Sequence, residues 1–365
     1  MKKFAVIAFM LMMVCGAASA DVVYTTANGD LGLVEITKSS STVTATNKGT
    51  QYESKIPGAT ISSFWENNTS NGNGNSKLIL VSPDVSPDNN VSGDRAYIFS
   101  ASSLSKPDDE EPVILTGTFG TPKIVKTETG NTLYAASDDA LREYMTSNFT
   151  VRQSYTPTSK DLGITTDPKI KDLIIDTGTI CALIERNATS GDVLMYFSGA
   201  LEKGSQITIK HPAHAINFVN SGIAVGHDSG VVLVSGSASK DVEGITGAVT
   251  AICRDTSAGF YYVVSGDGLY HYDGEKTTTS SALTSGNGTL LNAGDNVLAA
   301  IIGDNLELIN MENDNTIATL NVAPTSIAVR TATGQSGGSG GSGCNLGGVG
   351  IILMMSLCVM KVKKS

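Results

Sequence analysis

The chain has 365 residues, of which 41% are hydrophobic and 16% are charged, with 39 glycines, 10 prolines and a formal net charge of −10. This composition can bury a substantial core, and short apolar runs separated by Gly, Ser, Thr and Asn favour an all-β protein over a helical one. The acidity argues against nucleic-acid binding, because an acidic surface repels phosphate backbones.

The first 20 residues predict a signal peptide. Two lysines open the segment, an apolar run follows, and Ala18 and Ala20 supply the small residues of a cleavage site. The mature protein is therefore expected to begin at Asp21 and to be exported. Without the five lysines of this segment and of the C-terminal end, the body has 20 Lys and Arg against 35 Asp and Glu, a net charge of −15.

Residues 259–272 contain the unit that is repeated through the body, residues 21–330. Their sequence, Gly-Phe-Tyr-Tyr-Val-Val-Ser-Gly-Asp-Gly-Leu-Tyr-His-Tyr, has two apolar runs separated by a turn. Gly266 and Gly268 permit the positive φ angles of tight hairpin turns, and the flanking Tyr and Val suit a pleated sheet. A single hairpin is marginally stable in water, so several must pack together.

The same pattern predicts seven hairpins. Every turn contains Asp and six contain Gly, which are residue types that turns select, so these aspartates are interpreted as structural. The hairpins are residues 21–36, 77–99, 131–144, 179–197, 222–234, 259–272 and 296–309.

A strand precedes most hairpins and another follows each of them, which makes units of four antiparallel strands. Units of about 44 residues with four strands are typical of propeller blades, so the sequence predicts an all-β, seven-bladed β-propeller. The preceding strands are predicted at residues 59–64, 122–126, 170–176, 215–219, 248–253 and 289–292, and the following strands at residues 42–46, 112–115, 149–155, 206–210, 242–245, 276–282 and 316–321.

The two ends of the body predict how the ring closes. The first hairpin has no strand before it, whereas residues 323–330 have the pattern of a preceding strand with no hairpin after it. If this C-terminal strand completes the first blade, in a Velcro-like closure, the ring has no open seam. Such circular pairing is not expected of an open solenoid or a sandwich.

Blade two contains two polar insertions, which we expect to be loops at residues 66–76 and 82–94. The second resembles the first half of a calcium-binding loop, but Phe99 stands where a closing Glu should complete the shell. Calcium is therefore a weak alternative to a plain polar turn, and no other cofactor is predicted. The candidate ligands are Asp88, Asn90, Ser92 and Asp94.

The remaining reactive residue types do not predict a catalytic site. His211 and His214 are close in sequence but lack a third ligand, so a zinc site is not favoured. His271 lies between two tyrosines on a predicted strand and is expected at the surface or between blades. Cys181 and Cys253 lie in similar apolar strands two units apart, so we expect buried free thiols rather than a disulfide.

Residues 331–343 form a Gly/Ser linker, and residues 344–365 form a hydrophobic tail with a lysine-rich end. The apolar run is about 15 residues, shorter than the roughly 20 of a comfortable membrane span. The lysines place the end of the chain in the cytoplasm and the body outside. We therefore expect a C-terminal hydrophobic helix that anchors the protein to the membrane.

The glycine-rich motif ending at Cys344, the apolar run and the basic end together resemble the C-terminal sorting tails of the GlyGly-CTERM and Synergist-CTERM kind. The resemblance implies recognition and cleavage by an intramembrane sorting protease, with Gly343 and Cys344 at the processing and lipid-attachment point. It covers the tail and says nothing of the body. An ordinary single-span anchor is the alternative.

Three functions remain open on the sequence. We favour an exported, surface-anchored propeller that binds a protein or glycan ligand through its loops and is not an enzyme. The body is also similar in outline to propellers of the YVTN and PQQ-repeat kind, which implies as an alternative a lactonase- or quinoprotein-like enzyme with a metal at the central channel. A structural protein of the cell envelope is the third possibility.

Overall fold

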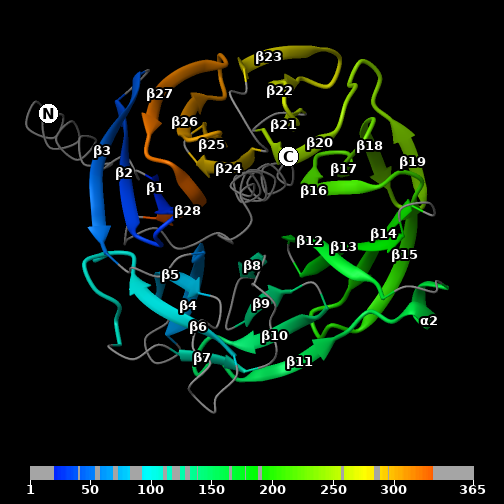
Figure 1. Cartoon of the computed structure of the whole chain (residues 1–365), viewed down its shortest axis with the longest axis horizontal. Helices are drawn as coiled ribbons and strands as arrows, with labels where there is room; N and C mark the ends of the chain where they lie inside the picture. The colour runs from blue at the N-terminus through cyan, green and yellow to red at the C-terminus, as the bar shows by residue number, and fades with distance from the viewer. Residues whose placement is uncertain are drawn as a thin grey trace, which may run out of the picture.

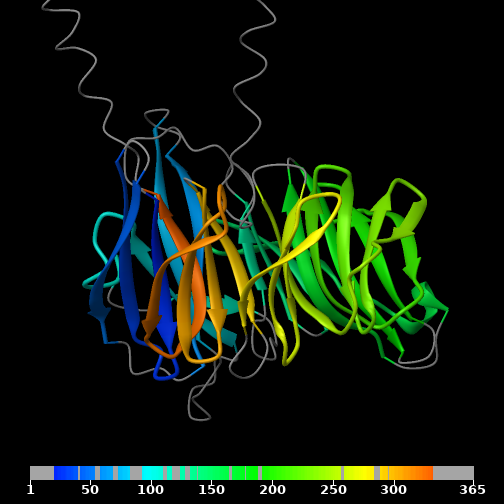
Figure 2. The same cartoon turned by 90° about the horizontal axis from the view of Figure 1, so that it is seen from above.

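The computed structural model is a ring of seven four-stranded antiparallel sheets (Figure 1). Figure 2 shows the disc from the side, with the strands crossing between its two faces. The all-β, seven-bladed propeller predicted from the sequence is therefore confirmed. The structure describes residues 20–331, except for residues 40–41, 54–57, 69–72, 83–92, 110–112, 117–123, 128–131, 138, 164–166, 177, 188–190, 256–258, 283–287 and 295.

The strands of each blade follow one another from the centre of the disc to its rim (Figure 1). Blade one contains β28 (Pro324–Thr331), β1 (Ala20–Thr26), β2 (Leu31–Ser39) and β3 (Thr42–Tyr52). Blade two contains β4 (Thr60–Asn68), β5 (Asn73–Ser82), β6 (Gly93–Ser100) and β7 (Val113–Thr116). Blade three contains β8 (Ile124–Thr127), β9 (Thr132–Ala136), β10 (Leu141–Met145) and β11 (Val151–Tyr155). The short helix α2 (Ser159–Leu162) leads to blade four, which contains β12 (Lys169–Asp176), β13 (Thr179–Asn187), β14 (Gly191–Phe197) and β15 (Lys203–Ile209).

The last three blades have the same arrangement. Blade five contains β16 (Ala213–Val219), β17 (Gly222–His227), β18 (Gly230–Ser235) and β19 (Ala238–Asp241). Blade six contains β20 (Val249–Arg254), β21 (Phe260–Val264), β22 (Gly268–Tyr272) and β23 (Thr277–Ala282). Blade seven contains β24 (Thr289–Gly294), β25 (Val297–Ile302), β26 (Asn305–Asn310) and β27 (Asn315–Asn321).

The hairpin of β21 and β22 illustrates how the repeated unit folds. Val264 pairs with Gly268 at the end of the ladder, and the backbone N–H of Asp267 donates to the carbonyl of Val264 at 3.1 Å. Gly266, in the turn, has a φ of 72°, a conformation that residues with a Cβ rarely adopt. The glycine therefore sets the turn, and the apolar residues on each side form the strands.

The first and last described strands lie side by side in blade one. β1 pairs antiparallel with β28, with Ala20 opposite Thr331. A buried ion pair links the same strands, because Oδ2 of Asp21 lies 3.0 Å from Nη2 of Arg330. Both ends of the described body therefore reach the same face of the disc, which we call the terminal face; the other is the opposite face.

The hydrophobic core lies between blades rather than within them. Seven clusters of buried apolar side chains occupy the seven junctions between neighbouring blades. At the junction of blades five and six, for example, Val231 packs with Val249 and Phe260. Because burial of apolar surface is the main favourable term in folding, each blade depends on both of its neighbours.

Side chains of the innermost strands add hydrogen bonds across three of these junctions. Asp172 of β12 accepts from the backbone N–H of Ile216 at 2.9 Å, and Asn217 of β16 donates to the carbonyl of Ile252 at 3.0 Å. The hydroxyl of Ser326 in β28 accepts from the backbone N–H of Ile61 in β4 at 2.9 Å. These bonds hold neighbouring blades in a fixed register around the centre.

Two predicted strand boundaries were wrong. The outer strand of blade five is Ala238–Asp241, not residues 242–245, because a tight turn at Gly236 returns the chain at once and a fully exposed outer strand needs no apolar residues. Val242 and Ile245 follow the strand and fill the cluster between blades five and six. Part of the predicted loop 66–76 is also strand, since Asn68 of β4 pairs with Asn73 of β5.

Several predicted features lie outside the described residues. These are most of the signal peptide, nearly all of the linker, the hydrophobic tail and most of the second polar insertion in blade two, residues 82–94. Within the part of the chain that the structure describes, no helix has the length and the apolar character needed to cross a membrane.

Candidate functional site

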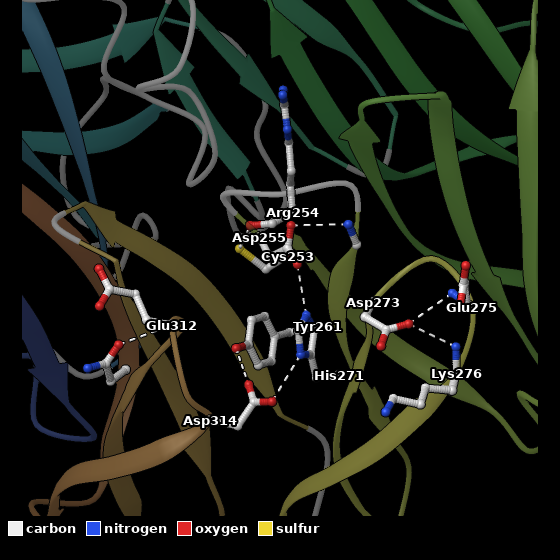
Figure 3. Close-up of polar contacts among 12 residues, drawn as sticks. Cys253, Arg254, Asp255, Tyr261, His271, Asp273, Glu275, Lys276, Glu312 and Asp314 are labelled. Carbon is white, nitrogen blue, oxygen red and sulfur yellow. Dashed lines mark hydrogen bonds and ion pairs between the residues drawn. The ribbon is translucent and has the colours of Figure 1, made fainter.

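A polar cluster lies on the terminal face at the junction of blades six and seven (Figure 3). It consists of Asp255, Tyr261, His271 and Asp314, and we call it the His271 cluster. Asp255 follows the innermost strand of blade six, whereas Tyr261 and His271 come from the next two strands. Asp314 comes from the neighbouring blade, in the connection between β26 and β27.

The strand register brings two of these side chains together. Tyr261 of β21 pairs directly with His271 of β22, and their rings stack with centroids 4.3 Å apart and an interplanar angle of 10°. Asp314 reaches the pair from the next blade because its backbone adopts a left-handed conformation, with a φ of 57°, in the tight connection before β27. Aspartate tolerates this conformation better than most residues with a Cβ.

Both ring nitrogens of His271 face carboxylates. Nε2 lies 2.8 Å from Oδ2 of Asp255, and Nδ1 lies 3.1 Å from Oδ2 of Asp314. The hydroxyl of Tyr261 donates to Oδ1 of Asp314, and the backbone N–H of Gly259 donates to Oδ1 of Asp255 at 3.2 Å. Both nitrogens of His271 and both carboxylates of the cluster therefore have hydrogen-bond partners.

The surroundings favour the charged form of this imidazole. Burial lowers the pKa of His271, but hydrogen bonds and charge from Asp255 and Asp314 outweigh burial, so the pKa is raised overall. Burial, together with the hydrogen bond that it donates to Asp314, raises the pKa of Tyr261. An imidazole between two carboxylates, one from each blade, therefore links blade six to blade seven.

The geometry indicates that His271 has a structural role and does not act as a general base. A general base needs a nitrogen with a free lone pair within reach of a substrate proton, and both nitrogens of His271 face carboxylates. The thiol of Cys253, on the adjacent strand, is fully buried. The prediction that His271 lies at the surface or between blades is confirmed, since it bridges two blades.

Further carboxylates surround the cluster on the terminal face. Asp273 accepts from the backbone N–H groups of Glu275 and Lys276, both at 2.9 Å, and these bonds lower the pKa of Asp273 (Figure 3). Glu312 accepts from Asn296 and lies 3.9 Å from the ammonium of Lys38 in blade one. This part of the terminal face is therefore acidic, with its carboxylates held by nearby donors.

A second cluster lies on the opposite face, and the sequence predicts only part of it. His211, in the connection between blades four and five, stacks on His227 with ring centroids 4.7 Å apart. His214 pairs with Asp228 at 2.5 Å. His227 was missed because it ends the next strand, in the turn of a predicted hairpin. The pairing of β16 with β17 brings it near, since Ala213 lies opposite His227.

Neither cluster forms a metal site. Across the described ranges, no group of three or more His, Cys, Asp or Glu residues is arranged to hold an ion. The weak calcium candidates Asp88, Asn90 and Ser92 lie outside those ranges, and Asp94 lies in β6. Calcium binding at this loop therefore stays the weak alternative to a plain polar turn.

Of the other predicted residues, some lie within the described ranges and some lie outside them. Cys181 and Cys253 are free and buried, as predicted, and burial raises the pKa of Cys181. Asp21, the expected first residue of the mature chain, lies in β1 next to Ala20, where it is buried. Ala18, Gly343 and Cys344 lie outside the described residues.

Comparison with known proteins identifies the fold and nothing more specific. No family model and no curated protein matches this chain. Among solved structures, the WD40 β-propeller domain of Doa1 is 10% identical with a TM-score of 0.52, over 78% of this chain and 86% of that one. The computationally designed Ika8 protein is 11% identical with a TM-score of 0.52, over 90% of this chain and 95% of that one. U3-55K is 8% identical with a TM-score of 0.52, over 69% and 81%. The body is thus a WD40-like β-propeller in fold.

Proposed function

We propose that the protein is an exported β-propeller that is tethered at the cell surface by its C-terminal tail and binds a protein or glycan ligand without catalysing a reaction. The observation that carries the proposal is the pairing of Ala20 with Thr331. It means that the N-terminal segment and the C-terminal tail both join the body at the terminal face. One face is thus committed to the tether, and the other is left for a partner.

The linker length fits a tethered disc. The 13 residues 331–343 are rich in Gly and Ser, and a flexible chain of that length has a root-mean-square span of about 20 Å. A disc held this close keeps the terminal face toward the membrane and the opposite face outward. Ring closure by β28 belongs to the same proposal. A force on the tail then acts on β28, which is paired with β1 within blade one.

A binding role also fits the polar chemistry of the described residues. The two histidine clusters are used to hold blades and connections together, and both nitrogens of His271 are committed to carboxylates. WD40-like propellers provide rigid rings whose connections form the surface, and function is carried by sites placed on such a ring. The ligand is therefore sought on the connections of the opposite face.

The tether is tested by deleting residues 332–365. We expect the full-length protein in the membrane fraction and the truncated protein in the medium, because the tail is the only proposed anchor. A Cys344→Ser variant, which keeps the length of the tail, separates two forms of the tether: it should be released if a lipid on Cys344 holds the protein, and should stay in the membrane fraction if the apolar run holds it. Mass spectrometry of the mature C-terminus then distinguishes a chain cleaved near Gly343, with or without a lipid on Cys344, from an intact single span. Release of the full-length protein into the medium would contradict the tether.

Ligand binding is tested with loop deletions in blade two. Of the described residues, Asn73 begins β5 at the terminal face and Ser82 ends it at the opposite face; residues 69–72 precede this strand in the chain and residues 83–92 follow it. We expect deletion of residues 83–92 to abolish capture of surface proteins or glycans from an array, and deletion of residues 69–72 to leave it intact. Deletion of residues 283–287 is the control for a shortened loop elsewhere. Equal capture by all variants would remove the basis for a loop-borne site.

A further inference from the structure

We propose that the stack of His211 on His227 is an acid-sensitive latch, which holds the connection between blades four and five against the opposite face and opens when His227 is protonated. The latch has three contacts. The two imidazole rings stack at 4.7 Å with an interplanar angle of 15°, the backbone N–H of Asp228 donates to the carbonyl of Pro212 at 3.2 Å, and His214 pairs with Asp228. Together they fasten residues 210–214 to the turn after β17.

The hydrogen bond at Nδ1 fixes the neutral form of His227. The backbone N–H of Ser229 donates to Nδ1 at 3.2 Å, so this nitrogen must be an acceptor. In a neutral imidazole the proton then lies on Nε2. Protonation would place a second N–H at Nδ1, directly facing the N–H of Ser229. Two donors cannot bond each other, so charging the ring removes the hydrogen bond between His227 and the turn that follows it.

The second nitrogen offers no compensation. Nε2 of His227 is buried and has no hydrogen-bond partner among the described residues, and the residue as a whole is only 4% exposed. A charged imidazole would therefore gain no acceptor inside the protein. Burial lowers the pKa of His227, and the neighbouring His211 lowers it further. Exposing the ring to solvent is the way to accommodate the charge at the lowest free-energy cost, and it requires His211 to move away.

The charged groups around His227 come from every element beside it. The connection contributes His211, β16 contributes His214, the following turn contributes Asp228, and β19 contributes Asp241. Asp228 and Asp241 favour the charged form, whereas the two histidines oppose it. Asp228 is already paired with His214, which leaves Asp241 as the nearby carboxylate that an exposed imidazolium could meet.

The opening is limited by an anchor at the start of β16. Asp192, which is buried, accepts from the backbone N–H of Ala213 at 2.7 Å, and Lys171 donates to the carbonyl of Ala213 at 2.9 Å. These bonds do not involve a histidine. We therefore expect movement of residues 210–212 and 227–229 while the blades themselves stay closed.

The test uses the whole protein labelled with ¹⁵N-histidine, because four histidines give a resolvable spectrum. Between pH 7.5 and 5, we expect the His227 ring to stay in the neutral Nε2–H form below the range in which free imidazoles titrate, and then to charge together with a shift of the Ser229 amide. Hydrogen exchange of residues 227–229, corrected for intrinsic pH dependence, should rise by roughly threefold or more over the same range, while β25 and β26 do not change. Titration of His227 with no change at Ser229 would overturn the latch.

Two variants locate the effect. His227→Asn keeps an acceptor for Ser229 but cannot be charged, so the acid-induced exchange should disappear. His211→Phe keeps a stacked ring without a second charge, so the exchange should persist and begin at a different pH from wild type. Acid-induced exchange that survives in His227→Asn, or a midpoint unchanged in His211→Phe, would assign the opening to another group.

Discussion

His227 is buried and His271 is largely buried; they lie in neighbouring blades, at opposite faces of the disc, and their surroundings are reversed. His271 has a carboxylate at each nitrogen, whereas His227 has a backbone donor at one nitrogen and, among the described residues, no partner at the other. The first site stabilises a positive charge and the second excludes one. The difference shows that burial alone does not set the charge of a histidine; the hydrogen-bonding groups at the two nitrogens decide it.

The reversal has a physical consequence for each face. The attraction between a protonated His271 and the carboxylates of Asp255 and Asp314 is strongest where both carboxylates are charged. The junction of blades six and seven is therefore held in mild acid. The stack on His227 depends on a neutral ring, so the connection between blades four and five is held at neutral pH and above. The terminal face and the opposite face therefore respond to acid in opposite directions.

The largest expected effect comes from removing the doubly paired ring. His271→Ala removes the imidazole that contacts both Asp255 and Asp314, so we expect a loss of about 3–5 kcal/mol in the free energy of unfolding. Urea denaturation followed by circular dichroism measures it. The matched control is His214→Ala, which removes a half-exposed pair with Asp228 and should cost less than about 1 kcal/mol. Equal losses in the two variants would contradict the assignment of His271 as an interblade clamp.

A smaller effect is expected from neutralising one side of the same clamp. Asp314→Asn retains an oxygen that can accept from Tyr261 but removes a charge beside His271, so we expect a loss of about 1–2 kcal/mol at pH 6. The same change should lower the pKa of His271, which ¹⁵N chemical shifts report directly. A His271 pKa that does not move would mean that Asp255 alone sets its charge.

The pH dependence of stability separates the two histidines. The pKa of His271 is raised above 6.5, so its contribution is complete below that pH and is lost as the pH rises through the folded value. The pKa of His227 is lowered, so its contribution is present above pH 6.5 and is lost as the pH falls through the folded value.

We expect the stability advantage of wild type over His271→Gln to shrink between pH 6.5 and 8.5. The difference between wild type and His227→Asn should instead shift in favour of the variant below pH 6. Parallel curves for the two variants would rule out the reversal.

The smallest expected effect is that of His211→Phe at neutral pH. His211 is exposed and its replacement keeps an aromatic surface against His227, so we expect a change of less than about 1 kcal/mol. Thermal melting at pH 7.5 measures it, with His211→Ala as the comparison that removes the stacked ring. A larger loss for Phe than for Ala would show that the stacked geometry is not what the connection requires.

The repeated unit was readable from the sequence because its signals are local. Turn aspartates and glycines between alternating apolar residues are found within a dozen positions, as in the hairpin around Gly266, and they predict strands wherever one face is buried. The outer strand of blade five carries no such signal, because Ala238–Asp241 is exposed on all its residues. The neighbouring apolar residues Val242 and Ile245 mimic a strand pattern, although they fill a junction between blades.

The histidine clusters were less accessible for a different reason. Their partners come from separate blades or from strands whose register must be known first. Asp314 reaches His271 from the next blade, and His227 meets His211 only through the pairing of β16 with β17. A hairpin pattern predicts where each strand lies, but it does not predict which side chains of neighbouring blades meet around the ring.

The pairing of β1 with β28 also governs when the protein can fold during synthesis. Thr25 and Thr325 are hydrogen-bonded although they stand 300 positions apart in the chain. A chain still emerging from the ribosome therefore holds six complete blades and one with its inner edge bare, and such an edge invites pairing with other chains. Closing so long a loop is slow compared with forming a local hairpin. A stop codon before residue 324 would thus yield a nearly full-length product that aggregates, whereas truncation after residue 331 would leave the ring able to close.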